Sequence, residues 1–145
     1  MNNIVAKKAQ SEKEINDALS VRYQVFVVEQ KINKDLQHDS WDEICDHFVA
    51  YLDNRAVGAG RIRYIAPKIA KIERMAVLSD LRGKNIGGEI LKSMIGYMED
   101  NNVNEVVLNS QYHAKGFYEK FGFKIEGEIF QETNIDHARM KKKLK

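Results

Sequence analysis

The chain has 145 residues, which suits a single domain over 1–145 with a hydrophobic core of its own. Its 23 lysine and arginine residues nearly balance its 21 aspartate and glutamate residues, so the charge carries no nucleic-acid-binding signature. No apolar run approaches the roughly 20 residues that span a bilayer, no signal peptide opens the chain, and the single cysteine, Cys45, suits a reducing cytoplasm.

The first elements in chain order are predicted to be a strand, Ile4–Ala9, and a helix that begins after Ser11. Glu14 follows Ser11 by three residues, which matches a capping box. Apolar residues at three- and four-residue spacing then give this helix one core-facing side. That side is predicted to carry Ile15, Leu19, Tyr23 and Phe26.

Residues 31–46 are polar and aperiodic, which indicates a short helical excursion or a loop over a site, anchored by Trp41 and Ile44. Two hypotheses stay open for the acidic side chains in this segment: they attract a cationic amine, or they form a solvated loop. Their spacing matches no standard pattern of metal ligands, so no metal site is predicted. The acidic residues are Asp39, Asp42, Glu43 and Asp46, flanked by His38 and His47.

Two strand-like runs follow, and the sequence Asp53-Asn54-Arg55 between them indicates a hairpin. Three consecutive strands before a long helix predict a meander and then a crossover. No repeat or linker interrupts the pattern. The predicted strands are His47–Leu52, Val57–Ile65, Ala70–Leu78, Glu105–Asn109, Ile125–Phe130 and His137–Leu144, and the predicted helices are Ile86–Asn101 and Tyr112–Phe121.

The start of the long helix is rich in glycine and positive charge. Arg82 and Lys84 accompany three glycines, Gly83, Gly87 and Gly88. Free backbone N–H groups and the positive end of the helix dipole make such a start a site for a phosphate-bearing ligand. The spacing fits neither a nucleotide P-loop nor a dinucleotide fingerprint. A solvated basic helix start is the alternative.

The stretch Arg82–Gly87 resembles the acyl-CoA loop of the GCN5-related N-acetyltransferases (GNAT), Arg/Gln-x-x-Gly-x-Gly/Ala, with Asn85 in place of the first glycine. Asparagine tolerates left-handed backbone well. Two further blocks, within Val21–Gln30 and Leu108–Met140, resemble this family in order and spacing, and the match is closest to its ElaA-like branch. The resemblance implies an α/β (α+β) fold, with a mixed, mostly antiparallel sheet and helices on both faces.

In this family the pantetheine arm of acetyl-CoA lies like an added strand between two parted central strands. The resemblance therefore implies acetyl-CoA as co-substrate, with no metal, and a helix terminus that holds the phosphates. A backbone N–H near Met75 or Ala76 would stabilise the oxyanion. The implied cofactor-binding residues are Met75, Ala76, Val77, Arg82, Gly83, Lys84, Asn85, Ile86, Gly87, Gly88 and Gln111.

Tyr118 is the candidate general acid, because it matches the tyrosine that lies beside the CoA sulfur in much of the family; the alternative is an aromatic core residue. Glu73 and His137 are rival bases, with His137 slightly ahead. Each also has a purely structural alternative, as an ion-pair partner or an edge-strand histidine. Imidazole exchanges protons near neutral pH, which suits a base. Strand alternation predicts that Glu73, Met75 and Val77 share one face.

Three residues in the opening helix and the turn after it, Arg22, Glu29 and Gln30, are candidate substrate-binding residues, because that segment usually walls the acceptor side. The sequence thus predicts acetyl transfer from acetyl-CoA to a primary amine of a small molecule or peptide, directly within a ternary complex. The alternative is an inert acetyl-CoA sensor or partner-binding module, since a fold alone does not decide function. No nucleic-acid or membrane partner is expected, and a homodimer stays open.

Overall fold

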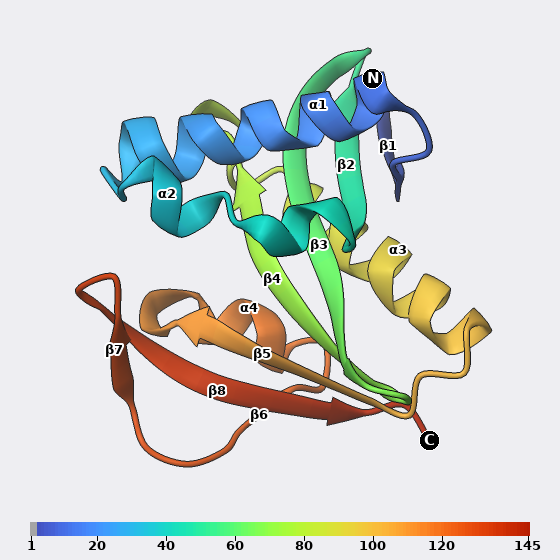
Figure 1. The fold of residues 1–145 in the computed structure, drawn as a ribbon, viewed down its shortest axis with the longest axis vertical. Helices are drawn as coiled ribbons and strands as arrows, with labels where there is room; N and C mark the ends of the chain where they lie inside the picture. The colour runs from blue at the N-terminus through green and yellow to red at the C-terminus, as the bar shows by residue number, and fades with distance from the viewer. Residues whose placement is uncertain (1–2) are drawn as a thin grey trace.

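The computed structural model describes residues 3–145. Its strands form one sheet in the order β1-β2-β3-β4-β5-β8-β6, with β7 paired to β8 outside this path (Figure 1). Only β4 and β5 pair in parallel, so the predicted mixed, mostly antiparallel sheet is confirmed. The strands are β1 Ile4–Lys8, β2 Asp46–Leu52, β3 Arg55–Ala66, β4 Ile69–Val77, β5 Glu105–Gln111, β6 Lys124–Ile125, β7 Phe130–Glu132 and β8 Ile135–Lys143.

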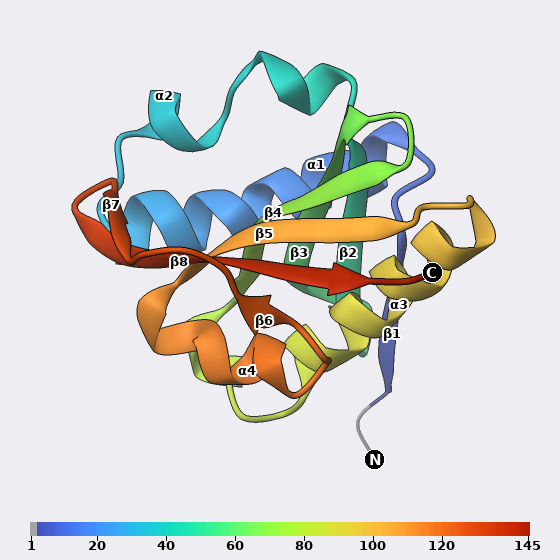
Figure 2. The same cartoon turned by 90° about the horizontal axis from the view of Figure 1, so that it is seen from below.

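Helices cover both faces of the sheet, as predicted (Figure 2). One face carries α1 (Glu12–Arg22), which continues into a π-helix, Tyr23–Glu29. The other carries α3 (Ile86–Asp100) and α4 (Lys115–Glu119). The remaining helical segments are α2 (Lys34–Gln37) and three 3₁₀ turns, Ser40–Glu43, Ser79–Leu81 and Tyr112–Ala114. Within residues 3–145, no helix has the length and apolarity needed to cross a membrane.

Each face has its own apolar core. Small strand residues such as Ala59 and Ala76 let α1 approach the first face. On the second face a Cβ on Gly58 would lie 2.6 Å from the Ile90 side chain, so only glycine lets α3 pack this closely on β3. The α3 residues buried there recur at helical spacing and are Ile86, Ile90, Leu91, Met94 and Met98.

The sheet opens between its two central strands. β4 and β5 pair only from Ile69 with Glu105 to Ile72 with Leu108, and beyond that point they separate (Figure 1). The second half of β4 therefore has an edge with no strand partner among the described residues. This gap is the parting that the sequence resemblance implies.

A β-bulge lies in β4 at Arg74, whose φ of 60° is in the left-handed region. One extra residue reverses the side-chain alternation along the rest of the strand. Met75 and Val77 pack against the α3 core, whereas Glu73 bonds to Arg61 on the other side of the sheet. The prediction that Glu73 shares a face with Met75 and Val77 is therefore wrong.

The first helix differs in detail from its prediction. The Ser11 hydroxyl accepts the Glu14 N–H, but the Glu14 carboxylate accepts from Gln10 N–H instead of closing the capping box on Ser11. Tyr23, predicted on the core-facing side, is 44% exposed. The π-helix that begins at this residue has a wider turn than an α-helix, so the α-helical period does not continue through it.

The 31–46 segment is a helical excursion, one of the two predicted forms, but its anchors differ from those predicted. Trp41 is 43% exposed and Ile44 is 71% exposed. Polar residues, Gln37 and Asp42, are buried in their place. Further along the chain, the predicted strand Ile125–Phe130 is replaced by the short strands β6 and β7.

Candidate active site

The glycine-rich loop before α3 has the backbone that its sequence predicts. Asn85 precedes the first residue of α3 with φ of 65°, so it adopts the left-handed conformation that a glycine would otherwise supply. Its side chain lies directly over Gly88, where a Cβ would come within 2.2 Å of the Asn85 Oδ1. A larger residue at position 88 would therefore displace the Asn85 side chain from this position.

A cavity of about 780 Å³ extends from this loop along the open edge of β4. The π-helix closes one side of it, and the segment that contains α4 closes another. Of the eleven predicted cofactor-binding residues, ten line it and Lys84 does not. The ten are Met75, Ala76, Val77, Arg82, Gly83, Asn85, Ile86, Gly87, Gly88 and Gln111.

The backbone of β4 offers hydrogen-bonding groups to this cavity. Leu78 N–H donates to the Val57 carbonyl on β3 at 3.0 Å. Because backbone groups alternate sides along a strand, those of Val77 and Met75 face the open edge while those of Ala76 face β3. Of the two predicted oxyanion donors, Met75 N–H is thus the better placed.

Arg82 connects the loop to the π-helix. It binds Glu29 through two hydrogen bonds of 2.6 Å and donates to the Val77 carbonyl at 3.0 and 3.1 Å. The hydrogen bond from Arg82 lowers the pKa of Glu29 and raises that of Arg82. Glu29, predicted to bind substrate, therefore lies on the cofactor side of the site.

A second cavity, of about 330 Å³, lies beside the first, between α2, β4, β5 and β8. Gln30 and Gln111 exchange hydrogen bonds of 3.0 and 3.3 Å near the junction of the two cavities. The catalytic candidates Tyr118, His137 and Glu73 all line the second cavity. The side chains shared by both cavities are Phe26, Met75, Gln111, Ala114 and Tyr118.

Tyr118 combines the two roles that the sequence leaves open. Its ring packs edge-on against Phe117 and Phe123, with centroid distances of 4.9 and 6.0 Å, so it is part of the core. It also lines both cavities. Burial raises the pKa of Tyr118, which keeps the phenol protonated and able to donate.

His137 is held in one orientation on β8. Its Nδ1 lies 2.7 Å from the Ile135 carbonyl oxygen, and because a carbonyl can only accept, Nδ1 carries the proton. Nε2 lies 3.4 Å from the Glu132 carboxylate, and the ring stacks on Phe130. Nε2 is therefore the atom that can take up a proton.

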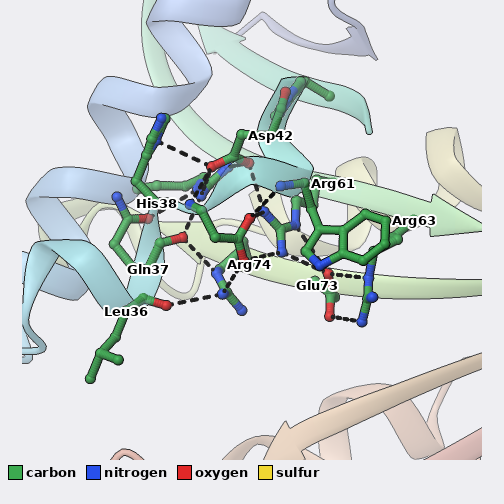
Figure 3. A network of polar contacts seen from close by, with 12 residues as sticks. Leu36, Gln37, His38, Asp42, Arg61, Arg63, Glu73 and Arg74 are labelled. Atoms are coloured by element: carbon green, nitrogen blue, oxygen red, sulfur yellow. Dashed lines mark hydrogen bonds and ion pairs between the residues drawn. The ribbon is translucent and has the colours of Figure 1, made fainter. Parts of the chain in front are cut away.

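Glu73 is surrounded by cations (Figure 3). Arg61 and Arg63 both donate to its carboxylate, and Lys71 Nζ lies 3.2 Å away. Burial alone would raise the pKa of Glu73, but the hydrogen bonds from Arg63 and Arg61 outweigh it and lower the pKa. These contacts favour the ion-pair alternative over the role of a general base.

Arg22, the third predicted substrate residue, is fully buried. It donates to both Asp42 oxygens at 2.7 and 3.0 Å and to Gln37, and it lines neither cavity. The prediction that Arg22 contacts substrate is therefore wrong: its guanidinium secures the 31–46 segment to α1.

The acidic stretch is not a free anionic surface either. Asp39 and Asp42 bind Arg61 on β3, at 2.7 Å each, and Asp39 also binds Arg74 at 3.2 Å. These two carboxylates are thus already neutralised by arginines, which weakens the hypothesis that they attract a cationic amine. The predicted site did not include Arg61 or Arg74. The only signal in the sequence that could have indicated them is a charged residue within a strand-like run.

Within residues 3–145, no group of three or more histidine, cysteine, aspartate or glutamate side chains is arranged to hold a metal ion. Cys45 lines neither cavity, and burial raises its thiol pKa to about 11. The groups that line the cavities include the Tyr118 phenol and the His137 imidazole.

A parted sheet, a glycine-rich helix start and two joined cavities define an acyltransferase type of fold, and comparison with known proteins agrees. A family model described as an acetyltransferase (GNAT) domain matches residues 6–144. The chain belongs to the GNAT acetyltransferase family, whose co-substrate is acyl-CoA.

Individual relatives agree with this assignment. The chain is 34% identical over 135 residues to the uncharacterized N-acetyltransferase YjcF of Bacillus subtilis, covering 92% of this chain and 96% of the relative. It is 27% identical over 132 residues to the protein ElaA of Escherichia coli, covering 87% and 85%. The crystal structure of ElaA superposes with a TM-score of 0.82 at 24% identity, covering 97% and 99%. A crystal structure from Lactobacillus plantarum superposes with a TM-score of 0.88 at 22% identity, covering 99% and 98%.

Proposed function

We propose that the protein is a cytoplasmic N-acetyltransferase that moves an acetyl group from acetyl-CoA to a primary amine, directly within a ternary complex. The observation that carries this proposal is the meeting of the two cavities at Tyr118. The larger cavity, with its glycine-rich helix start, suits the phosphates and the extended arm of CoA. The smaller one suits the acceptor.

The amine must lose a proton before it can attack. An alkyl ammonium with a pKa near 10.4 costs roughly 4–5 kcal/mol to deprotonate at pH 7. In the proposed reaction His137 Nε2 takes this proton, directly or through a water, because Nδ1 is already committed to Ile135. The amine nitrogen then attacks the thioester carbonyl carbon.

The N–C bond forms as negative charge moves to the thioester oxygen, where the Met75 N–H is the proposed donor. When the intermediate collapses, the C–S bond breaks and the Tyr118 hydroxyl protonates the departing thiolate, while the second proton that the amine nitrogen loses on becoming an amide restores the hydroxyl. Because the Cys45 thiol lies outside both cavities, direct transfer is favoured over an acetyl-cysteine intermediate.

The test is release of free CoA thiol from acetyl-CoA in the presence of a panel of primary amines, with Tyr118→Phe as the test variant. We expect turnover to fall by roughly 10- to 1000-fold with acetyl-CoA still bound, because phenylalanine keeps the ring but lacks the acidic proton. Tyr23→Phe, at an exposed tyrosine outside both cavities, is the matched control. Acetyl-CoA binding without turnover of any amine would instead indicate the sensor alternative.

A further inference from the structure

The wall of the smaller cavity that faces the 31–46 segment carries a surplus of positive charge. One connected network of ion pairs and hydrogen bonds joins this wall to β3 and α1 (Figure 3). It contains five cations and three carboxylates. The cations are Arg22, Arg61, Arg63, Lys71 and Arg74, and the carboxylates are Asp39, Asp42 and Glu73.

Arg74 belongs to this network (Figure 3) and lines the cavity. Its Nε donates to the Gln37 carbonyl, and its Nη2 donates to Leu36 and Asp39. Nη1 has no hydrogen-bond partner anywhere in residues 3–145. Burial and the charge of Arg61 lower the pKa of Arg74, as expected for a cation whose charge is only partly neutralised by nearby carboxylates.

The backbone at Arg74 is also unusual. A non-glycine residue with φ of 60° in a strand costs of order 1–3 kcal/mol, and such strain is concentrated at functional sites. Without the bulge, the side chain of this position would follow the ordinary alternation of β4. The bulge instead directs a guanidinium to the boundary between α2 and the cavity.

Lys71 is the second cation of this wall, with 18% of its side chain exposed. Its nearest carboxylate, Glu73, already accepts from Arg61 and Arg63, so it cannot fully compensate a third cation. The opposite wall has the reverse character, because Glu132 and His137 lie there as a pair. The cavity thus has a cationic end and a basic, anionic end.

We propose that the acceptor is a small amino carboxylate, bound with its carboxylate at Arg74 Nη1 and Lys71 and its amine toward His137. The inference rests on the proposed function of the same cavity. A volume of about 330 Å³ suits a small molecule. The free donors at this wall are few, which fits the two oxygens of a carboxylate better than the three of a phosphate.

The experiment compares straight-chain ω-amino acids, from glycine to 6-aminohexanoate, each with its own carboxamide. In the longer members the amine is far from the carboxyl group, so the pair differs in negative charge but hardly in amine basicity. For at least one chain length we expect kcat/KM to be roughly 10- to 100-fold higher for the carboxylate, mainly through KM. Equal kcat/KM for every pair would overturn the proposal.

Arg74→Gln should reduce the carboxylate-to-carboxamide ratio of kcat/KM toward one, and Arg74→Lys should retain part of it. Both variants keep an unbranched side chain at the left-handed position, so the backbone cost is similar. Arg55→Gln is the matched control, since Arg55 is exposed and lines neither cavity. A ratio that Arg74→Gln leaves at its wild-type value would contradict the proposed carboxylate contact.

A binding measurement separates this inference from the proposed function. If no amine releases CoA, the proposed function fails, yet the cavity can still be titrated calorimetrically with 6-aminohexanoate and its carboxamide in the presence of CoA. Tighter binding of the carboxylate would support the anion contact. Equal binding, or no binding of either compound or of the shorter pairs, would overturn it.

Discussion

His137 and Glu73 line the same cavity, but their side chains have different hydrogen-bond partners. His137 has one nitrogen fixed by the Ile135 carbonyl and the other able to accept a proton. Glu73 is bonded to Arg61 and Arg63, which lower its pKa and make it a weak base. These contacts support the proposal that His137 is the base.

His137→Gln should lower turnover by roughly 100-fold or more, because the amide can hydrogen-bond but cannot take up the proton of the amine. Glu73→Gln should mainly lower the thermal midpoint, because it removes the charge that compensates Arg61 and Arg63. Measuring kcat and the midpoint for both variants separates the two roles. A stable Glu73→Gln protein that loses as much turnover as His137→Gln would reverse the assignment.

Residue conformations were predictable from sequence where the cause is local. Asn85 could be assigned a left-handed backbone because asparagine tolerates it and the family pattern has glycine there. Arg74 could not, because its conformation arises from a register shift against β3 that no local pattern encodes. The error in the predicted face of Glu73 follows from that bulge.

At the scale of elements, the 31–46 segment depends on one buried carboxylate. Asp42 accepts hydrogen bonds from Arg22 of α1 and from Arg61 of β3, and so links the segment to a helix and a strand. Because burial of two guanidinium groups is costly unless they are paired, this residue is expected to contribute strongly to stability.

Asp42→Asn should lower the free energy of unfolding by roughly 3–5 kcal/mol, since it leaves two buried arginines without their shared carboxylate. Asp80→Asn is the matched control: its partner, Arg55, is exposed, and the loss should stay within about 1 kcal/mol. Urea denaturation of the wild-type, Asp42→Asn and Asp80→Asn proteins gives the loss of unfolding free energy for each variant. Similar losses for the two variants would mean that Asp42 is not the anchor.

The helices and strands, like the residue conformations, were predicted accurately where their cause is local in the sequence. The helix α3 was predicted to within one residue, because its apolar stripe repeats at helical spacing over four turns. The 31–46 segment was not resolved from sequence, because its buried anchors are polar and their partners, Arg22 and Arg61, are distant in the chain. The open edge of β4 was expected only through the family resemblance.

At the scale of the molecule, the network should make stability sensitive to acid. Burial would raise the pKa values of Asp39, Asp42 and Glu73, but their arginine partners outweigh it and hold all three below their usual range. Carboxylates with lowered folded-state pKa values stabilise the fold fully above the unfolded-state values near 4. That stability is lost as the pH falls from there toward the lower folded-state values.

The urea midpoint should therefore be nearly constant between about pH 7 and 5 and fall steeply below about pH 4. Asp42→Asn, which lacks the most strongly shifted of the three groups, should show a shallower fall over the same range. A midpoint that changes equally with pH in both proteins would place the acid-sensitive groups elsewhere.

We propose that the cavity of about 780 Å³ between the π-helix and α3 is the acetyl-CoA site. The most direct measurement is calorimetric titration of acetyl-CoA into the folded protein, with ATP as a control that shares phosphate groups but lacks the pantetheine arm. We expect micromolar binding of acetyl-CoA with one site per chain and no measurable binding of ATP. Absence of acetyl-CoA binding by a folded sample would contradict the cofactor assignment and the catalytic roles that depend on it.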